Sequence, residues 1–350
     1  MNEIPTKEVL DRYKKIGLVD KRVDKERGLN IYVYTMSTQK ERLWNYVTLN
    51  ARGIVYDDKG RLIQRCLPKF FNHDEPDGIN VIQTHRQLWA VPEITEKLDG
   101  SLIKVTNDPE YGLVITSKGS FQSDQARMAE QILNSDKYRL FKFTPGLTYV
   151  FELVSPKNRI VIDYKDTKLV LLCVIDNESG AELKLKDNET PFSKPNAYTS
   201  DVLMDVNRLN DGKDLHEGVV VNYGNYRLKY KTNEYLRLHR VVTNYTAKRV
   251  WKDLSSGRET DRLNMPEEFI NWLNRTENSL KGKYDDLSAD VSMAILYCRD
   301  MTNKEVATCP NPFIRNHKAY VLAYRSGKDV PQMMWRAIKP KEGVKWNSYY

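Results

Sequence analysis

The sequence predicts an α+β protein with two domains, a body of antiparallel sheets over residues 1–242 and an all-helical domain over residues 243–350. Two observations support this expectation. Up to about Arg240, short β-branched and aromatic segments alternate with turn residues, which is typical of antiparallel strands. Beyond Arg240, apolar residues recur at steps of three and four, the period of an amphipathic helix. A chain of 350 residues is long enough for two such domains.

The predicted strands are short and are separated by turn sequences such as DDKG, NDPEYG and DNESG. They cover residues 31–36, 53–58, 62–67, 101–106, 111–117, 148–154, 159–164, 168–176, 217–223 and 226–231. Side chains of a strand alternate between its two faces, so Lys229 and Lys231 are expected to share one face of the last strand.

One helix is expected inside the body and several in the tail. Ser123 is a suitable N-cap for a helix within residues 123–141, where Met128, Ile132 and Leu133 follow at helical spacing. Pro266 suits the first turn of a helix in the tail, and residues 317–325 continue in the same style. The apolar residues with helical spacing in the tail are Phe269, Ile270, Leu273, Tyr284, Leu287, Val291 and Ile295.

Composition narrows the class of protein. Lysine and arginine outnumber aspartate and glutamate by 55 to 47, a formal net charge of +8, which favours a polyanionic partner such as a nucleic acid or a nucleotide. The cysteines form no CxxC pair, so free thiols are expected rather than a zinc ribbon. The first residues contain no apolar signal core, and the longest apolar run, residues 169–175, is too short to cross a bilayer. We therefore expect a soluble protein of a reducing compartment, the cytoplasm.

The strongest local signal is EKLDGSLIKV, with Lys97, Asp99 and Gly100 in a tight loop between strand-like segments. A lysine must be neutral to attack phosphorus, whereas a free lysine has a pKa of ~10.4; partial burial and cationic neighbours lower such a pKa. Gly100 would let the backbone approach a nucleotide closely. Asp99 could accept a ribose hydroxyl or bind the water shell of a metal. The same pattern also occurs in ordinary exposed turns, so this segment alone does not establish a nucleophile.

Other charged residues follow in an order that strengthens the interpretation. Glu152 ends an apolar strand, and Glu217 directly precedes another. Lys229 and Lys231 would repel each other on one strand face unless an anion lay between them, so a triphosphate is a natural occupant. Each of these residues alone is equally compatible with a solvated face or a surface ion pair. Further candidates for contact with a nucleotide are Arg52, Lys69, Phe71 and Lys118, and Phe71 fits the core equally well.

With these motifs the chain resembles the covalent nucleotidyltransferases, the superfamily of polynucleotide ligases and mRNA capping enzymes. Residues 97–100 resemble the nucleophile motif, and residues 151–153, 217–218 and 229–231 resemble later motifs. Within the superfamily, the chain most resembles the bacteriophage ATP-dependent RNA ligase 1 family of the tRNA-repair type. The phrases that carry this resemblance are ARGI, PKFFN, EKLDGSL, SKGS, FELVSPKNRIVI, EGVVV and LKYKTNEYLRLH. The resemblance implies an antiparallel-sheet nucleotidyltransferase domain, with adenylyltransferase activity, followed by a helical domain that selects RNA.

The resemblance implies a reaction in three steps. Lys97 attacks the α-phosphate of ATP and keeps AMP, AMP passes to the 5′-phosphate of an RNA, and a 3′-hydroxyl then displaces AMP. Mg²⁺, or Mn²⁺ in its place, is expected because it offsets the charge of the phosphates. The implied substrate is RNA with 5′-phosphate and 3′-hydroxyl ends, cleaved tRNA in particular. An end-healing kinase–phosphatase is expected in the same pathway, in an infected host cell, and the protein itself is expected to be a monomer.

The resemblance also implies roles for individual residues. The catalytic set is Lys97, Asp99, Lys118, Glu152, Glu217 and Tyr235. The set that contacts ATP is Arg52, Lys69, Phe71, Gly100, Glu152, Lys229 and Lys231. Glu152 would bind the ribose, and Glu217 would hold a hydrated metal or steady the nucleophile. Asp261 corresponds to a metal-linked acidic residue, and Tyr32 or Tyr34 to an aromatic residue that contacts the nucleotide.

Two other classes of function remain compatible with the sequence. A DNA ligase or a capping guanylyltransferase would share the first step, but those families usually append a β-barrel domain where this chain has a helical tail. A non-catalytic RNA-binding protein with a decayed site is the second alternative, and the presence of every expected charged residue argues against it. Transfer of label from α-labelled ATP or GTP to the protein, and joining of a nicked DNA, would separate these classes.

Overall fold

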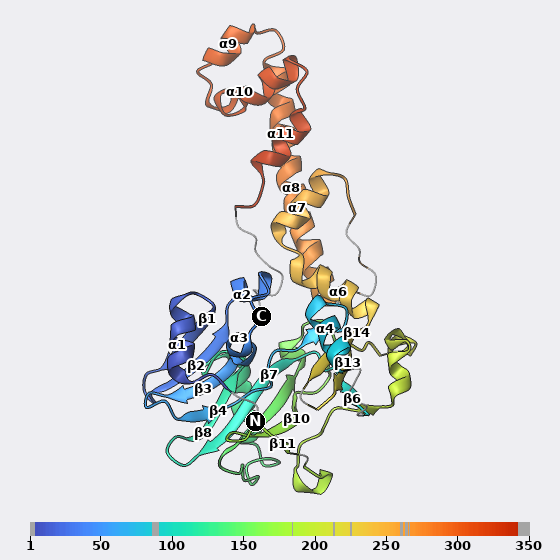
Figure 1. The fold of residues 1–350 in the computed structure, drawn as a ribbon. Coiled ribbons are helices and arrows are strands. Elements are labelled where there is room, and N and C mark those ends of the chain that lie inside the picture. The colour runs from blue at the N-terminus through green and yellow to red at the C-terminus, as the bar shows by residue number, and fades with distance from the viewer. Residues whose placement is uncertain are drawn as a thin grey trace. The chain divides into compact units, whose positions relative to one another are not determined.

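The computed structural model describes residues 4–85, 91–183, 185–212, 214–224, 226–259, 262, 265 and 267–341. The chain forms two compact units, Met1–Leu236 and Arg237–Tyr350. The division lies a few residues before the expected boundary at residue 242. In the part of the chain that the structure describes, the first unit holds antiparallel sheets with helices and the second holds helices only (Figure 1). The predicted α+β class with a helical C-terminal domain is confirmed.

The first sheet of the N-terminal unit is antiparallel, with strand order β1-β2-β3-β4. Its strands are β1 (Val19–Asp24), β2 (Leu29–Tyr34), β3 (Arg52–Asp57) and β4 (Leu62–Gln64). The short helices beside it are α1 (Lys7–Lys15), α2 (Met36–Lys40) and α3 (Tyr46–Asn50). Leu10 of α1 and Val47 of α3 pack with Tyr32 and Ile54 in a buried cluster. Figure 1 shows α1 and α3 beside the strands of this sheet. Strand β1 escaped prediction because VDKRVD is mostly polar.

The second sheet is antiparallel, with strand order β11-β10-β9-β7-β8. Its strands are β7 (Ser101–Asp108), β8 (Gly112–Ser117), β9 (Leu147–Val154), β10 (Lys168–Asp176) and β11 (Glu182–Leu183). Helix α5 (Asp124–Leu133) covers one face, and Ala129 and Leu133 pack there against Ile103 and Phe151. The predicted N-cap is confirmed, because the Ala126 N–H donates to the Ser123 hydroxyl at 3.2 Å.

The third sheet has the order β12-β6-β13-β14-β5, in which only β14 and β5 run parallel. Its strands are β5 (Phe71–Asn72), β6 (Glu93–Glu96), β12 (Ala197–Tyr198), β13 (Gly218–Asn222) and β14 (Arg227–Lys231). The short 3₁₀ helices η3 (Ser200–Leu203) and η4 (Val206–Asn210) pack over Val219 and Val221. The other elements of this unit are α4 (Pro76–His85), η1 (Pro156–Asn158) and η2 (Asp187–Glu189).

The expectation of a strand over residues 159–164 is wrong. Only the short helix η1 lies between β9 and β10, and residues 159–164 form an irregular loop. The run RIVIDY has the composition of a strand, but the backbone N–H groups of Val161 and Ile162 donate to the carboxylate of Asp99. Because a side chain takes these donors, they are not available to a strand ladder.

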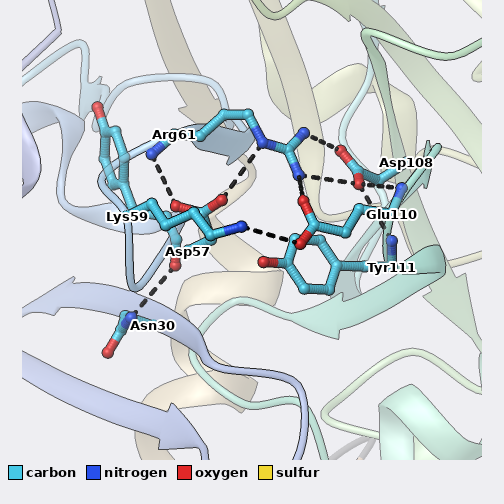
Figure 2. A network of polar contacts seen from close by, with 8 residues as sticks. Asn30, Asp57, Lys59, Arg61, Asp108, Glu110 and Tyr111 are labelled. Atoms are coloured by element: carbon cyan, nitrogen blue, oxygen red, sulfur yellow. Dashed lines mark hydrogen bonds and ion pairs between the residues drawn. The ribbon is translucent and has the colours of Figure 1, made fainter.

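A polar network joins the first sheet to the second at the ends of their hairpins (Figure 2). Arg61, in the β3–β4 turn, donates to both carboxylate oxygens of Asp108 at 2.6 and 3.2 Å. The same guanidinium reaches Glu110 at 3.1 Å and Asp57 at 3.3 Å. Asp57 is fully buried, so this ion pair lies at the edge of the protein interior.

The C-terminal unit consists of helices in its described part. They are α6 (Asn233–Asn244), which starts in the first unit, α7 (Ala247–Ser255), α8 (Glu267–Tyr297), α9 (Asn303–Thr308), α10 (Pro312–Arg325) and α11 (Val330–Ala337). The two apolar patterns predicted over residues 266–295 belong to the single helix α8. Phe269 and Leu273 are fully buried and pack with Val242 and Val250. Of the helices that the structure describes, none combines the length and the apolar composition needed to cross a membrane.

Candidate functional site

Lys97 lies in the loop that connects β6 to β7, as the sequence predicts. Its backbone N–H donates to the Gly218 carbonyl at 2.9 Å, which extends the pairing of β6 with β13 by one residue. Its side-chain Nζ lies 2.8 Å from Glu217 Oε2. Backbone and side chain of the lysine are therefore both held by the start of the same strand.

Glu217 is shared between two lysines. Its second carboxylate oxygen, Oε1, lies 2.8 Å from Nζ of Lys231, which stands opposite Gly218 in the register of β13 and β14. The Glu217 side chain is only 3% exposed, against 19% for Lys97, so the carboxylate sits beneath the more accessible amine. Of the two roles expected for Glu217, this geometry matches the steadying of the nucleophile.

Gly218 makes this arrangement possible. Its φ of 143° lies in the region that L side chains rarely adopt, and a Cβ here would overlap the Tyr230 carbonyl oxygen. Only glycine lets β13 and β14 approach so closely at the point where Glu217 meets Lys231.

Asp99 is buried, with 2% of its surface exposed. Its Oδ2 accepts the N–H groups of Val161 at 2.8 Å and Ile162 at 2.9 Å, and its Oδ1 accepts the hydroxyl of Tyr235 at 2.7 Å. Burial raises the pKa of Asp99, as does the nearby Glu217, while these hydrogen bonds act in the opposite direction. Both oxygens of Asp99 therefore accept hydrogen bonds from the protein, and its expected contact with a ribose hydroxyl or metal-held water stays a prediction.

Gly100 lies close to the backbone of β9. A Cβ at this position would overlap the Leu153 carbonyl oxygen and lie 3.0 Å from Cγ of Glu152. The absence of a side chain at Gly100 thus allows β9 to approach the lysine loop. This contact brings Glu152 next to the loop that carries Lys97.

Glu152 stands on β9, where it pairs with Leu102 on one side and Val170 on the other. Burial raises the pKa of its carboxyl group to about 7; Lys97 lowers it and Glu217 raises it further. All three groups are therefore close enough to interact, as the sequence predicts. A carboxyl group with this pKa changes charge near neutral pH.

Four cations surround this centre without a carboxylate partner at ion-pair distance among the described residues. They are Arg52, Lys69, Lys118 and Lys229. Arg52 and Lys229 both lie over the ring of Phe70, at 5.0 and 5.2 Å from its centroid. Burial lowers the pKa of Lys229 to about 7. Repulsion from the neighbouring cations lowers it in the same direction; they are Lys69, Lys97, Arg52 and Lys231. A set of half-buried cations without counter-ions is a site for an anion.

The other two cations, Lys69 and Lys118, also lie over aromatic rings. The Lys69 ammonium lies 4.2 Å from the ring centroid of Phe71 and 5.3 Å from that of Trp44, and it donates to the Phe70 carbonyl. Burial lowers the pKa of Lys69 to about 8. Phe71 is 8% exposed, so it is a core residue that also contacts a cation. The interpretation of Phe71 as a core residue is confirmed, and its contact with a nucleotide stays a prediction.

The structure distinguishes the two tyrosines of β2. Tyr32 is fully buried, and its hydroxyl donates to Asp11 at 2.9 Å. The hydroxyl of Tyr34 accepts from Lys118 at 2.9 Å, and its ring packs edge-on against Trp44 at 5.1 Å. Tyr34 is thus the β2 tyrosine that joins the cation group. Asp261, the expected metal ligand, lies outside the described residues.

Sequence reasoning missed several residues of this centre. Trp44, Phe70 and Tyr164 contact the candidate residues but were not among the candidates. Phe70 had a usable signal, because it stands between the candidates Lys69 and Phe71. Tyr164 had none, because its hydroxyl meets the Asp99 backbone across 65 residues of sequence.

A family described as RNA ligase matches residues 50–236, a range that includes every candidate site residue above except Tyr32, Tyr34, Trp44 and Asp261. The RNA ligase of Rhodothermus phage RM378 is 24% identical over 77% of this chain and 79% of its own length. A solved archaeal ATP-dependent RNA ligase superposes with a TM-score of 0.47 at 14% identity, over 93% of this chain and 77% of that one. A Naegleria gruberi RNA ligase variant, titled as holding ATP and Mn, covers 46% of this chain and 55% of its own with a TM-score of 0.36 at 17% identity.

Proposed function

This chain belongs to the RNA ligase family, and we propose that it seals RNA ends by means of an AMP group carried covalently on Lys97. The observation that supports this assignment is the combination of one accessible amine, paired with the buried Glu217, and four cations with no carboxylate at ion-pair distance in the described part of the chain. Such a centre has a nucleophile and a place for the phosphates of ATP. A protein that merely bound RNA would need the cations but not the paired amine.

In the first proposed step, Lys97 attacks the α-phosphorus of ATP. The ammonium must first lose a proton, and Glu217 Oε2 at 2.8 Å is a base within hydrogen-bond reach. The nitrogen lone pair then forms the N–P bond, and the bond from phosphorus to the bridging oxygen breaks. Pyrophosphate leaves with that electron pair, and the cations Arg52, Lys69, Lys118 and Lys229 would offset its charge.

The later steps transfer AMP to RNA and release it. A 5′-phosphate oxygen of RNA attacks the phosphorus of AMP, the N–P bond breaks, and the amine of Lys97 is restored. The 3′-hydroxyl of a second end then attacks the activated 5′-phosphate, so that a phosphodiester forms and AMP leaves. Tyr235 would act in these steps by holding Asp99, to which its hydroxyl donates, and by packing its ring against Lys231.

A divalent cation fits this centre if phosphates and water supply most of its ligands. Both oxygens of Glu217 already contact ammonium groups, and burial raises the pKa of Glu152 to about 7, so the described residues offer few free carboxylates. Mg²⁺ keeps several waters and binds phosphate oxygens readily. Glu152 and Glu217 would hold its water shell, and the ion would offset charge on the phosphates. We also propose Mn²⁺ as a substitute and Asp261 as a further ligand.

We further propose that the natural substrate is a broken RNA with 5′-phosphate and 3′-hydroxyl ends, cleaved tRNA in particular. The helical unit would select that RNA, since the described site residues from Arg52 to Tyr235 all lie in the first unit. A kinase–phosphatase that heals RNA ends would act before this enzyme. We place the enzyme in the cytoplasm as a monomer, where its four unpaired cysteines stay reduced.

The first test is Lys97→Ala with α-labelled ATP. We expect no labelled protein and no sealing of 5′-phosphorylated RNA with ATP, because the nucleophile is gone. The variant should still seal RNA that already carries AMP on its 5′ end, since that substrate bypasses the first step. Gel autoradiography measures the label, and denaturing gels measure the sealed RNA.

Lys142→Ala is the matched control, because Lys142 is an exposed lysine in the segment between α5 and β9. It should behave like the wild-type protein in both assays. Acid-labile protein–AMP formed at the wild-type yield by Lys97→Ala would show that another residue is the nucleophile. Label from GTP rather than ATP would contradict the assignment of the nucleotide.

A further inference from the structure

The loop of residues 159–164 is docked onto the lysine loop through one residue, Asp99. The carboxylate of Asp99 accepts the N–H groups of Val161 and Ile162, and in return the Asp99 N–H donates to the hydroxyl oxygen of Tyr164 at 2.9 Å. The two loops therefore exchange hydrogen bonds in both directions. Such a reciprocal arrangement fixes the backbone of each loop relative to the other.

These contacts lie two residues from the amine that is expected to react. The Lys97 N–H is held by the Gly218 carbonyl at 2.9 Å, and the Asp99 N–H is held by Tyr164. The backbone from Lys97 to Asp99 is thus anchored on both sides, by β13 and by Tyr164. The direction in which the lysine side chain leaves the backbone depends on both anchors.

We propose that Tyr164 is a positioning residue for Lys97, whose hydroxyl oxygen holds the lysine loop in the orientation needed for attack on the α-phosphorus. This inference rests on the proposed function of Lys97. Tyr164 does not touch the amine and acts through the Asp99 backbone.

Removal of the Tyr164 hydroxyl is a selective change. In Tyr164→Phe the loop of residues 159–164 keeps its bonds from Val161 and Ile162 to Asp99, so it stays docked. Only the acceptor of the Asp99 N–H is lost. Burial raises the pKa of Tyr164, so the hydroxyl stays protonated through the range used for assays and the comparison is not blurred by its ionisation.

The matched control is Tyr56→Phe. Tyr56 is a buried tyrosine of the first sheet, and its hydroxyl donates to the Pro5 carbonyl at 2.7 Å, away from the lysine loop. Each variant loses a hydroxyl that makes a hydrogen bond with a backbone group, Tyr56 from a buried position and Tyr164 from a half-buried one. If the two variants adenylylate at different rates, the cause is the contact of the Tyr164 hydroxyl with the lysine loop and not the loss of a tyrosine hydroxyl in general.

The experiment measures protein–AMP formation in single turnover across a range of ATP concentrations, together with sealing of pre-adenylylated RNA and a thermal melt. We expect Tyr164→Phe to slow adenylylation at saturating ATP by about tenfold, because small misplacements of a nucleophile are costly. The ATP concentration for half-maximal rate should stay within about twofold, since no phosphate contact is lost. Sealing of pre-adenylylated RNA, which does not use the nucleophile, should fall much less.

Three results would overturn the inference. Adenylylation by Tyr164→Phe at the rate of Tyr56→Phe would show that the hydroxyl does not position the lysine. Equal losses in adenylylation and in sealing of pre-adenylylated RNA, with a lowered melting temperature, would show a general structural role. Absence of protein–AMP in the wild-type protein would refute the proposed function itself, and the inference with it.

Discussion

Lys104 carries an amine that is completely enclosed by the first and second sheets. It donates to the Gly53 carbonyl and, at 2.9 Å, to Oε1 of Gln64, both of which are uncharged. A Cβ on Gly53 would lie 2.9 Å from the Lys104 amine and would overlap the Lys118 carbonyl oxygen. Lys104 therefore supports the backbone beside Arg52 and Lys118, two of the cations of the site.

The buried charge of Lys104 should make folding stability depend on pH. Burial lowers the pKa of Lys104 to about 8. An unfolded lysine has a pKa of ~10.4, so between these values unfolding takes up a proton and stability rises with pH. The unfolding free energy of the wild-type protein relative to Lys104→Met should increase by about 2 kcal/mol from about pH 7 to about pH 10.

Chemical denaturation of both proteins at several pH values measures this difference. Because the other titrating groups are common to both proteins, their contributions cancel. Lys168→Met, at an exposed lysine, should show no such change relative to the wild-type protein. A constant difference between wild type and Lys104→Met would mean that Lys104 keeps its proton in the folded state.

The candidate residues that the sequence predicted share a property that Lys104 and Tyr164 lack. Lys97, Glu217 and Lys231 belong to short local patterns, and each pattern follows or precedes an evident strand. The partners of Lys104 and Tyr164 lie 40 to 65 residues away in sequence. Contacts of that separation leave no spacing signal in a single chain, so only the structure could supply them.

The loop over residues 159–164 shows how a local contact can outweigh strand propensity. Its composition is β-branched and aromatic, yet its N–H groups bind a buried carboxylate. Other elements followed their patterns closely. Strand β14 (Arg227–Lys231) lies within the predicted range of residues 226–231, and α5 begins directly after its predicted cap. Hydrophobic period thus predicted these two elements, whereas the mostly polar β1 and the helices α1 to α4 of the body were not predicted.

The hairpin ends of the first two sheets depend on a shared arginine (Figure 2). Arg61→Ala would leave Asp57 and Asp108 enclosed without their cation. Arg61 is 43% exposed, so we expect a loss of about 2 kcal/mol in unfolding free energy, between the values for exposed and buried pairs. Burial raises the pKa of Asp108, but the bond to Arg61 outweighs it and the net pKa is lowered. The loss should therefore be largest near neutral pH and shrink on acidification below about pH 4.

Lys59→Ala is the control for this network. Lys59 is 77% exposed and makes a single ion pair with Glu110 at 3.3 Å, so its removal should change stability by less than about 0.5 kcal/mol. Denaturant unfolding of the two variants provides the comparison. Equal and small effects would show that the buried aspartates find other partners when Arg61 is removed.

The two units of the chain should contribute to different steps. The described members of the candidate site lie in Met1–Leu236, so deletion of residues beyond about 245 should reduce sealing of RNA more than it reduces protein–AMP formation. Parallel assays of label transfer and of sealing on nicked, single-stranded and tRNA-like substrates measure the two effects. A thermal melt must first show that the shortened protein is folded, because Val242 packs against Phe269 in the deleted part.

Equal losses in both assays by a folded, shortened protein would contradict a separate role for the helical unit. The sequence predicted this unit from apolar period alone and placed its start a few residues late. The helix α6 explains the difference, because it begins in the first unit and continues into the second. Because one helix runs across the boundary between the two units, the apolar pattern of the sequence does not change at that boundary.

The pairing of β2 with β3 has a practical consequence for shortening this protein from its other end. The segment that matches the RNA ligase family begins at residue 50, yet β3 is an interior strand whose neighbour β2 lies upstream at Leu29–Tyr34. A protein shortened to the matched segment would lack β2, so the N–H and C=O groups of β3 that pair with β2 would be exposed. Exposed strand edges of this kind promote aggregation. The borders of evolutionary similarity are thus not the borders of an autonomously folding enzyme, and a minimal version must retain the upstream hairpin.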